Sequence, residues 1–308
     1  MVPKRNKRAL QALLSLAGLL ILGVHSAAAE HARLQVAVAE PDIEAIVRAV
    51  GGDQVDTFSL FKGCILRKDL AVEPSVRERL LKADAVVWTG FFNESAAIHE
   101  SIKPLDQKGR ESRPQWIDVS RDVQRVNVPI STCFGYVEPS FMHGDPFFWL
   151  NPRNGIVIAR NVAEGLGNMR PERREYFLAN AQAFDAALRK DIERWRAELR
   201  PLSGLRVFTA QCGWNNFSQI GGPTFASCKQ SPGVLPAPDE LVRQVKALNV
   251  SVVIVDPNTP PEYGRAFREG LKAKVIEVPS SIESLTGAKS YSALFDNFIQ
   301  SLQEAAKS

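Results

Sequence analysis

Four cysteines offer the most reactive side chains in this sequence, Cys64, Cys133, Cys212 and Cys228. Each follows a segment with the composition of a strand, so we expect all four at the same ends of their strands. In an oxidising compartment an even number favours two disulfides, expected between Cys212 and Cys228 and between Cys64 and Cys133. Neighbouring parallel strands lie about 4.8 Å apart, which suits the first pair. The alternative is a thiolate site for a soft metal ion such as Cu(I) or Zn(II).

His143 is a second candidate, either as a metal ligand or as a solvated histidine in a loop. With Cys133 it could also form a nucleophile and base. No pattern near these two residues marks an acid partner to orient the base or an oxyanion motif, and a covalent mechanism needs such groups. The sequence therefore predicts a protein that is not an enzyme.

Arg67 and Lys68 either bind an anion or belong, with Asp69, to a solvated run of charges. Trp149 is expected to anchor the core beneath a long loop. Four phenylalanines either line a pocket for an organic ligand or pack in the core: Phe91, Phe92, Phe147 and Phe148.

A long amphipathic helix at 171–199 must position these groups. Its apolar residues recur at steps of three and four, while charged residues fill the other face. Pro171 suits a first helical position and Pro201 ends the pattern. At about 1.5 Å per residue the helix is about 44 Å long, more than one small domain needs. We therefore expect it to join two bodies.

Strand and helix patterns alternate on both sides of this helix. Strands are expected at 33–39, 55–60, 85–88, 116–119, 205–210, 224–226, 250–255 and 274–278. This alternation predicts an α/β fold with two parallel-sheet lobes joined by one long helix. Ligands bind beyond the carboxyl ends of such strands, so a cleft between the lobes is the expected site. The loops that would line it are 61–73, 120–147, 210–214, 227–236 and 256–261.

The first residues are typical of a cleaved signal peptide at 1–29, with a basic start, a short apolar run and Ala27-Ala28-Ala29. Without this segment the chain has 34 basic and 34 acidic residues, so its near-neutral charge gives no support for nucleic-acid binding. No cysteine stands at the cleavage point to carry a lipid. The expected domains are an N-terminal lobe at 30–168, a linking helix at 169–202 and a C-terminal lobe at 203–308.

One run resembles a known family. Residues 145–152, Asp-Pro-Phe-Phe-Trp-Leu-Asn-Pro, resemble the Asp-Pro-His-x-Trp-Leu-Asp-Pro motif of the zinc/manganese ABC-transporter solute-binding proteins. The segments 46–53, 74–75 with 82–87, and the 171–199 helix match the family in the same order. This resemblance implies a periplasmic solute-binding protein that delivers its cargo to an inner-membrane ABC permease. We expect it to be a monomer with no nucleic-acid partner.

The family's metal ligands do not carry over. The resemblance places them at Lys68 or Arg67, at Phe147, at Gln211 and near Pro260, with Asp256 the nearest carboxylate to the last. A cationic side chain about 4 Å from a dication costs roughly 8 kcal/mol at an effective dielectric of about 20. Structural zinc binding in small peptides is worth about 10 to 16 kcal/mol. If Arg67 or Lys68 points into the cleft, a bare metal ion is therefore a poor ligand there.

Several alternatives remain for the bound species. We expect no resident cofactor, although a transition metal is a possible cargo. The binding residues are then expected among Arg67, Lys68, His143, Phe147, Gln211 and Asp256. A metal chelate or a small organic anion would fit an atypical site. The other alternative is that this protein binds no small ligand and uses the same fold to interact with another protein.

Overall fold

The structure is a computed structural model that describes residues 32–62, 70–90, 92–109, 113–126, 147–209, 214–226, 237–286 and 290–307. All elements below belong to one compact unit, Leu34–Ser308. The expected signal peptide at 1–29 lies outside the described residues. No helix in the described part of the chain combines the length and apolar character needed to cross a membrane.

The first sheet has four parallel strands in the order β2-β1-β3-β4. They are β1 (Leu34–Val38), β2 (Val55–Ser59), β3 (Ala85–Trp88) and β4 (Gln115–Asp118). The connections contain α2 (Pro41–Gly51), α3 (Pro74–Leu80) and α4 (Phe92–Ile102), with the 3-10 helices η1 (Gly52–Gln54) and η2 (Lys103–Lys108). The central strands β1 and β3 contain the valine and alanine runs 36–38 and 85–87, whose residues have no exposed surface. Such strands suit a parallel sheet that is covered on both faces.

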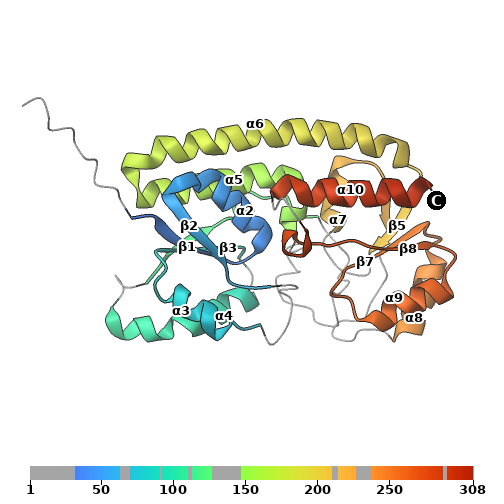
Figure 1. Cartoon of the computed structure of the whole chain (residues 1–308), viewed down its shortest axis with the longest axis horizontal. Coiled ribbons are helices and arrows are strands. Elements are labelled where there is room, and N and C mark those ends of the chain that lie inside the picture. Colours follow the sequence, from blue (N-terminus) through green and yellow to red (C-terminus); the bar gives the residue numbers. More distant parts are fainter. Residues whose placement is uncertain are drawn as a thin grey trace, which may run out of the picture. The chain divides into compact units, whose positions relative to one another are not determined.

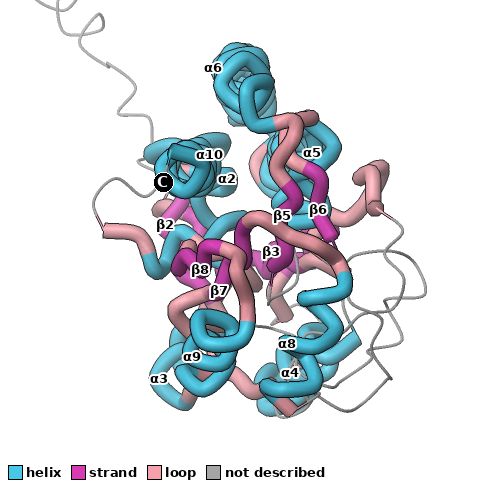
Figure 2. Tube along the Cα trace, turned by 90° about the vertical axis from the view of Figure 1, so that its right-hand side faces the viewer, coloured by secondary structure: helices cyan, strands magenta, loops and turns pink. Residues whose placement is uncertain are grey.

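The second sheet repeats this winding with the order β6-β5-β7-β8. Its strands are β5 (Arg206–Thr209), β6 (Thr224–Ala226), β7 (Val252–Val255) and β8 (Lys274–Glu277). Its helices are α7 (Trp214–Phe217), η8 (Ser218–Ile220), α8 (Pro238–Ala247), α9 (Pro261–Gly270), η9 (Ile282–Ser284) and α10 (Tyr291–Lys307). In the two views α2, α5, α6 and α10 cover one side of the sheets, and α3, α4, α8 and α9 cover the other (Figures 1 and 2).

Between the sheets the chain forms η5 (Phe148–Leu150), α5 (Pro152–Met169), η6 (Pro171–Arg173), α6 (Arg174–Leu199) and η7 (Arg200–Leu202). The long helix expected at 171–199 is confirmed as α6, except that its first turn is the 3-10 helix η6. The buried stripe is the expected one, although Phe184 is only partly buried. The side chain of Asn151 caps α5 by accepting a hydrogen bond from the Arg153 amide (3.1 Å).

The strand expected at 250–255 begins only at Val252. The residue before this segment, Asn249, has a φ of 49° and lies in the turn that follows α8. Asparagine tolerates this left-handed conformation better than most residues. Residues 250 and 251 therefore belong to the turn region rather than to the strand.

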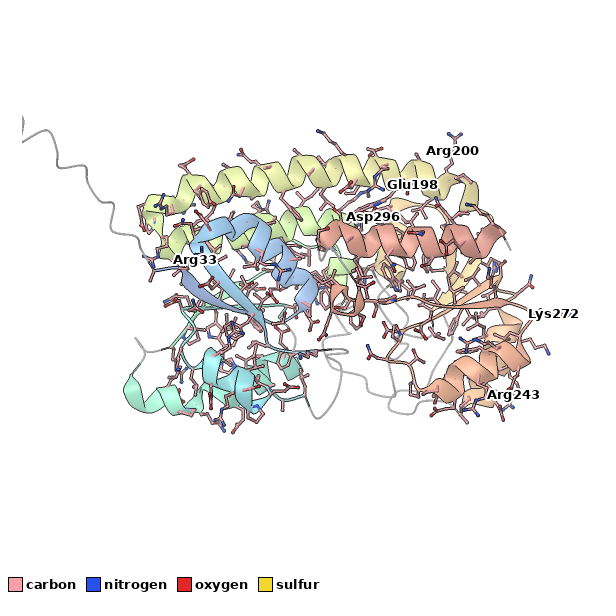
Figure 3. The ribbon with its side chains drawn as sticks, viewed as in Figure 1. Arg33, Glu198, Arg200, Arg243, Lys272 and Asp296 are labelled. Carbon is pink, nitrogen blue, oxygen red and sulfur yellow. The ribbon has the colours of Figure 1, made fainter. Side chains whose placement is uncertain are left out.

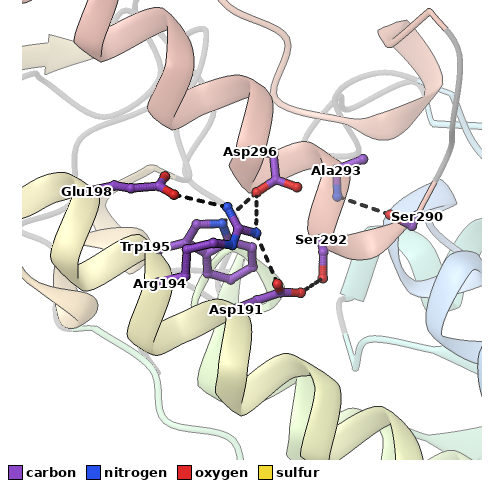
Figure 4. A network of polar contacts seen from close by, with 8 residues as sticks. All are labelled: Asp191, Arg194, Trp195, Glu198, Ser290, Ser292, Ala293 and Asp296. Carbon is purple, nitrogen blue, oxygen red and sulfur yellow. Dashed lines mark hydrogen bonds and ion pairs between the residues drawn. The ribbon is translucent and has the colours of Figure 1, made fainter.

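α6 contacts elements of both halves of this unit. In its first half, Asn180 donates from Nδ2 to the Val50 carbonyl at the end of α2 (2.9 Å). In its second half, Arg194 forms ion pairs with Asp191 (3.0 Å), with Glu198 (3.2 Å) and with Asp296 of α10 (2.7 Å; Figure 4). Figure 3 labels Glu198 on α6 and Asp296 on α10. Asp296 Oδ1 also accepts a hydrogen bond from the fully buried Trp195 indole (2.7 Å). α6 therefore connects α2 in the first half to α10 in the second.

The Trp195 indole gives a test of this connection. Replacing Asp296 with Ala leaves the indole N–H without its acceptor, which should lower the free energy of unfolding by about 1 to 3 kcal/mol in urea denaturation. Asp296→Asn keeps an acceptor oxygen and should lose less. Equal losses in the two variants would contradict a role for the indole bond, because both remove the exposed ion pair, which is worth about 0 to 1 kcal/mol.

Candidate functional site

The carboxyl ends of the central strands are where a ligand site is expected. The strand order reverses between β1 and β3 in the first sheet and between β5 and β7 in the second. Ligands of open parallel sheets bind in the crevice at such points. In the described part of the chain, Glu40 follows β1, Glu94 follows β3 and Asp256 follows β7.

Asp42 brings the ends of the two sheets together. This residue lies in the first turn of α2, directly after β1, and is 1% exposed. Its Oδ1 accepts hydrogen bonds from the Ile282 amide (2.8 Å) and the Ser281 hydroxyl (3.3 Å), both in the segment that follows β8. Its Oδ2 accepts a hydrogen bond from the Trp149 indole (3.1 Å). One carboxyl group therefore joins α2, η5 and η9.

The environment of Asp42 alters its protonation. Burial raises the pKa of Asp42 to about 6, while the hydrogen bonds from Ile282, Trp149 and Ser281 lower it and the charge of Glu283 raises it. Burial outweighs the donors because a buried carboxylate loses its hydration on all sides.

Two further glutamates are buried beside Asp42. Glu94 is fully buried, and its carboxyl accepts hydrogen bonds from the Thr89 amide (2.9 Å) and the Thr89 hydroxyl. Glu40 is 3% exposed, and its Oε1 has no hydrogen-bond partner among the described residues. Burial raises the pKa of Glu40 well above its usual range, and the charges of Glu94, Asp42 and Glu283 raise it further. We call Glu40, Asp42, Glu94 and Glu283 the carboxylate cluster.

Asp256 is held by loops of its own sheet. Its Oδ1 accepts hydrogen bonds from the Asn258 amide (2.8 Å) and side chain (3.0 Å). Its Oδ2 accepts from the Ser280 amide (2.8 Å) and hydroxyl (2.6 Å). A carboxylate has about four lone-pair positions, and these donors use them. This carboxylate therefore fixes the loop after β7 against the segment after β8. The ligand role of Asp256 stays a prediction.

Phe147 lies at the start of η5 and is partly buried. Its ring makes an edge contact with Trp149 (5.4 Å between centroids). Trp149 is 2% exposed, which confirms it as a core anchor, and its carbonyl accepts a hydrogen bond from the Tyr291 hydroxyl of α10. Phe148 is fully buried and belongs to the core.

The remaining predicted site residues lie outside the described residues. They are Arg67, Lys68, His143, Gln211 and the cysteines Cys64, Cys133, Cys212 and Cys228. The parallel pairing of β5 with β6, on which the Cys212–Cys228 prediction rests, is confirmed, with Phe208 opposite Ala226. The disulfides themselves stay predictions.

Within the described ranges, no three His, Cys, Asp or Glu side chains are arranged to hold a metal ion.

A cavity of about 230 Å³ borders the carboxyl end of β2, lined in part by Ser59, Lys62 and Glu73. A larger one of about 480 Å³ lies between α3 and α4, beside Arg77 and Glu100. The smaller cavity adjoins the expected ligand loop at 61–73.

Comparison with known proteins identifies the family. The model of the family described as zinc-uptake complex component A, periplasmic, matches residues 36–305. The chain belongs to this family. It is 27% identical to the high-affinity zinc uptake system protein ZnuA of Brucella abortus over 165 residues, covering 52% of this chain and 49% of that protein. It is 24% identical to the manganese ABC transporter substrate-binding lipoprotein PsaA of Streptococcus mitis over 165 residues, covering 53% and 50%. The chain thus spans about half the length of the curated relatives it matches.

Solved structures share the fold of this family member. The zinc-bound crystal structure of a ZnuA deletion mutant aligns with a TM-score of 0.68 at 19% identity, covering 89% of this chain and 97% of that one. The periplasmic zinc-binding protein TroA from Treponema pallidum aligns with a TM-score of 0.67 at 17% identity, covering 89% and 99%. These alignments confirm the predicted fold of two parallel-sheet lobes with a long connecting helix.

Sequence reasoning missed the carboxylate cluster. Glu40 and Asp42 flank Pro41 at a helix start, where acidic residues are common, and nothing in the local pattern marks them as buried. The available signal was their position directly after a central strand.

The raised pKa of Asp42 makes a prediction about stability. The folded pKa of about 6 exceeds the unfolded value of about 3.9, so the folded state binds the proton more tightly. The free energy of unfolding contributed by this residue should therefore rise as the pH falls from about 7 through about 6, and it reaches its full value of at most about 3 kcal/mol only below the unfolded pKa of about 3.9. Asp42→Asn should reduce this rise in urea denaturation.

Asp122→Asn is the matched control, because Asp122 is exposed and pairs only at the surface with Arg160 (3.1 Å). This variant should keep the pH dependence of the unchanged protein. An identical slope in Asp42→Asn would contradict the raised pKa.

Proposed function

We propose that this chain is the exported solute-binding component of an ABC-type transport system of the zinc and manganese family, with a cargo site unlike that of its relatives. The observation that carries the proposal is the set of hydrogen bonds from Asp42 to Ile282 and Ser281. They hold the segments that follow β1 and β8 against each other, which supports a site where a solute contacts groups from both halves of the chain. The family match over residues 36–305 supports the same function.

The proposed partners are an inner-membrane ABC permease and a small cargo, with the protein acting as a monomer in the periplasm. The signal peptide would be residues 1–29, followed by a lobe at 30–168, the linking helix at 169–202 and a second lobe at 203–308. The pairing of Arg194 with Asp296 (2.7 Å) supports small relative movement of the lobes, because it connects the linking helix to α10.

The cargo is proposed to differ from a bare Zn(II) or Mn(II) ion. The positions that the family resemblance assigns to ligands hold Lys68 or Arg67, Phe147, Gln211 and Pro260. None supplies the imidazole or carboxylate that these ions prefer. The remaining cargoes are a metal complex, a soft ion held by cysteines, or an organic anion held by Arg67 or Lys68.

Thermal melting against a panel of metal ions, metal chelates and small anions tests the transport function. A cargo at a hundred times its dissociation constant should add about 2.7 kcal/mol to the free energy of unfolding. We expect at least one member of the panel to raise the melting temperature. The absence of any shift would contradict a cargo-binding function and favour a ligand-free interaction protein.

Calorimetry with zinc chloride tests the loss of the metal ligands. The oxidised protein should bind zinc much more weakly than a family member that has the histidine ligands, because its matched positions lack metal-binding groups. Tight zinc binding by the oxidised protein that survives His143→Ala and Asp256→Ala would contradict this placement of the site. Zinc binding that appears only after thiol reduction would assign the ion to the cysteines.

A further inference from the structure

Glu40 and Glu94 flank the point where the strand order of the first sheet reverses. Glu40 comes two residues after β1, and Glu94 lies in the first turn of α4, which follows β3. β1 and β3 are adjacent parallel strands, with Val36 opposite Ala85. Both glutamates therefore follow the two strand ends beyond which ligands of such sheets bind.

Glu40 differs from the other buried acids of the carboxylate cluster. Asp42 and Glu94 accept hydrogen bonds from protein donors. Glu40 precedes α2 without capping it, and its buried Oε1 has no donor among the described residues. A buried carboxyl oxygen without a donor is costly, and a natural protein keeps such a group when another species satisfies it.

The described charges that act on Glu40 are all negative. They belong to Glu94, Asp42 and Glu283. Glu283 lies in η9, in the segment that follows β8. Together with burial these charges raise the pKa of Glu40, so its carboxyl holds a proton more tightly than an exposed glutamate does. A ligand with positive charge would replace that proton and relieve the repulsion.

The chemistry of such a ligand follows from the groups present. A bare metal ion needs several direct ligands, and none of the positions that the family resemblance assigns to ligands supplies an imidazole or a carboxylate. A cation that carries its own hydrogen-bond donors needs only an acceptor with negative charge, and charge-assisted bonds of this kind are the strong ones.

We propose that Glu40 binds a cationic hydrogen-bond donor, with Asp42, Glu94 and Glu283 supplying further negative charge around it. The donor is either an ammonium or guanidinium group of an organic solute or the amine or water ligands of a complexed metal ion. This inference rests on the proposed function, because it names the class of cargo for that site. It favours a metal complex over an anion among the proposed cargoes.

Calorimetry with putrescine, hexaamminecobalt(III) chloride and zinc chloride tests the proposal on the exported chain. Putrescine represents the organic source, and hexaamminecobalt(III) represents a complexed metal with no free coordination position. We expect at least one of these two to bind, and Glu40→Gln to weaken that binding at least tenfold. Glu193→Gln, an exposed change on α6, should bind as the unchanged protein does.

Thermal melting separates a binding effect from misfolding. Glu40→Gln removes a buried carboxyl without a partner, so it should melt at the same temperature as the unchanged protein or higher. Equal affinity of either probe for Glu40→Gln and the unchanged protein would overturn the inference. Binding of zinc chloride alone, unaffected by Glu40→Gln, would also overturn it while leaving the proposed function intact. No binding of these probes or of the wider panel would overturn both.

Discussion

The carboxyl group of Asp42 holds together the part of the molecule where a solute would bind. It accepts hydrogen bonds from Trp149, Ser281 and Ile282, three residues far apart in the sequence. Burial raises its pKa, so these contacts are kept against the cost of removing a carboxylate from water. The segments that follow β1 and β8 are held together because this one group accepts hydrogen bonds from both halves of the chain.

The positions of the strands and helices could be predicted because their patterns are local. Valine-rich runs predicted the buried strands, and spacing by three and four predicted α6. The start of β7 could not be predicted, because Asn249 adopts a left-handed turn conformation that only the backbone reveals. Glu40 and Asp42 escaped prediction for a different reason. Their burial depends on η5, η9 and α4, which pack against them from distant parts of the sequence.

The family resemblance and the described structure bear on different questions. The resemblance correctly predicted the fold and the order of elements, both of which follow from core packing. The ligand positions that it assigns hold Lys68, Phe147 and Gln211, and a fold can stay the same while the groups of its binding site change. The carboxylate cluster provides a different chemistry at the carboxyl ends of the strands. A fold with strand ends brought together by Asp42 and α6 can therefore keep its architecture while the recognition groups change.

Crystals of the protein with hexaamminecobalt(III) offer the most direct test of where the cargo lies, because the anomalous signal of cobalt locates the complex without reference to the protein density. The account predicts a cobalt peak beside the carboxyl ends of β1 and β3, with an ammine nitrogen about 3 Å from a carboxyl oxygen of Glu40. A cobalt peak beside residues 68 or 211, with the Glu40 carboxyl out of reach, would contradict it.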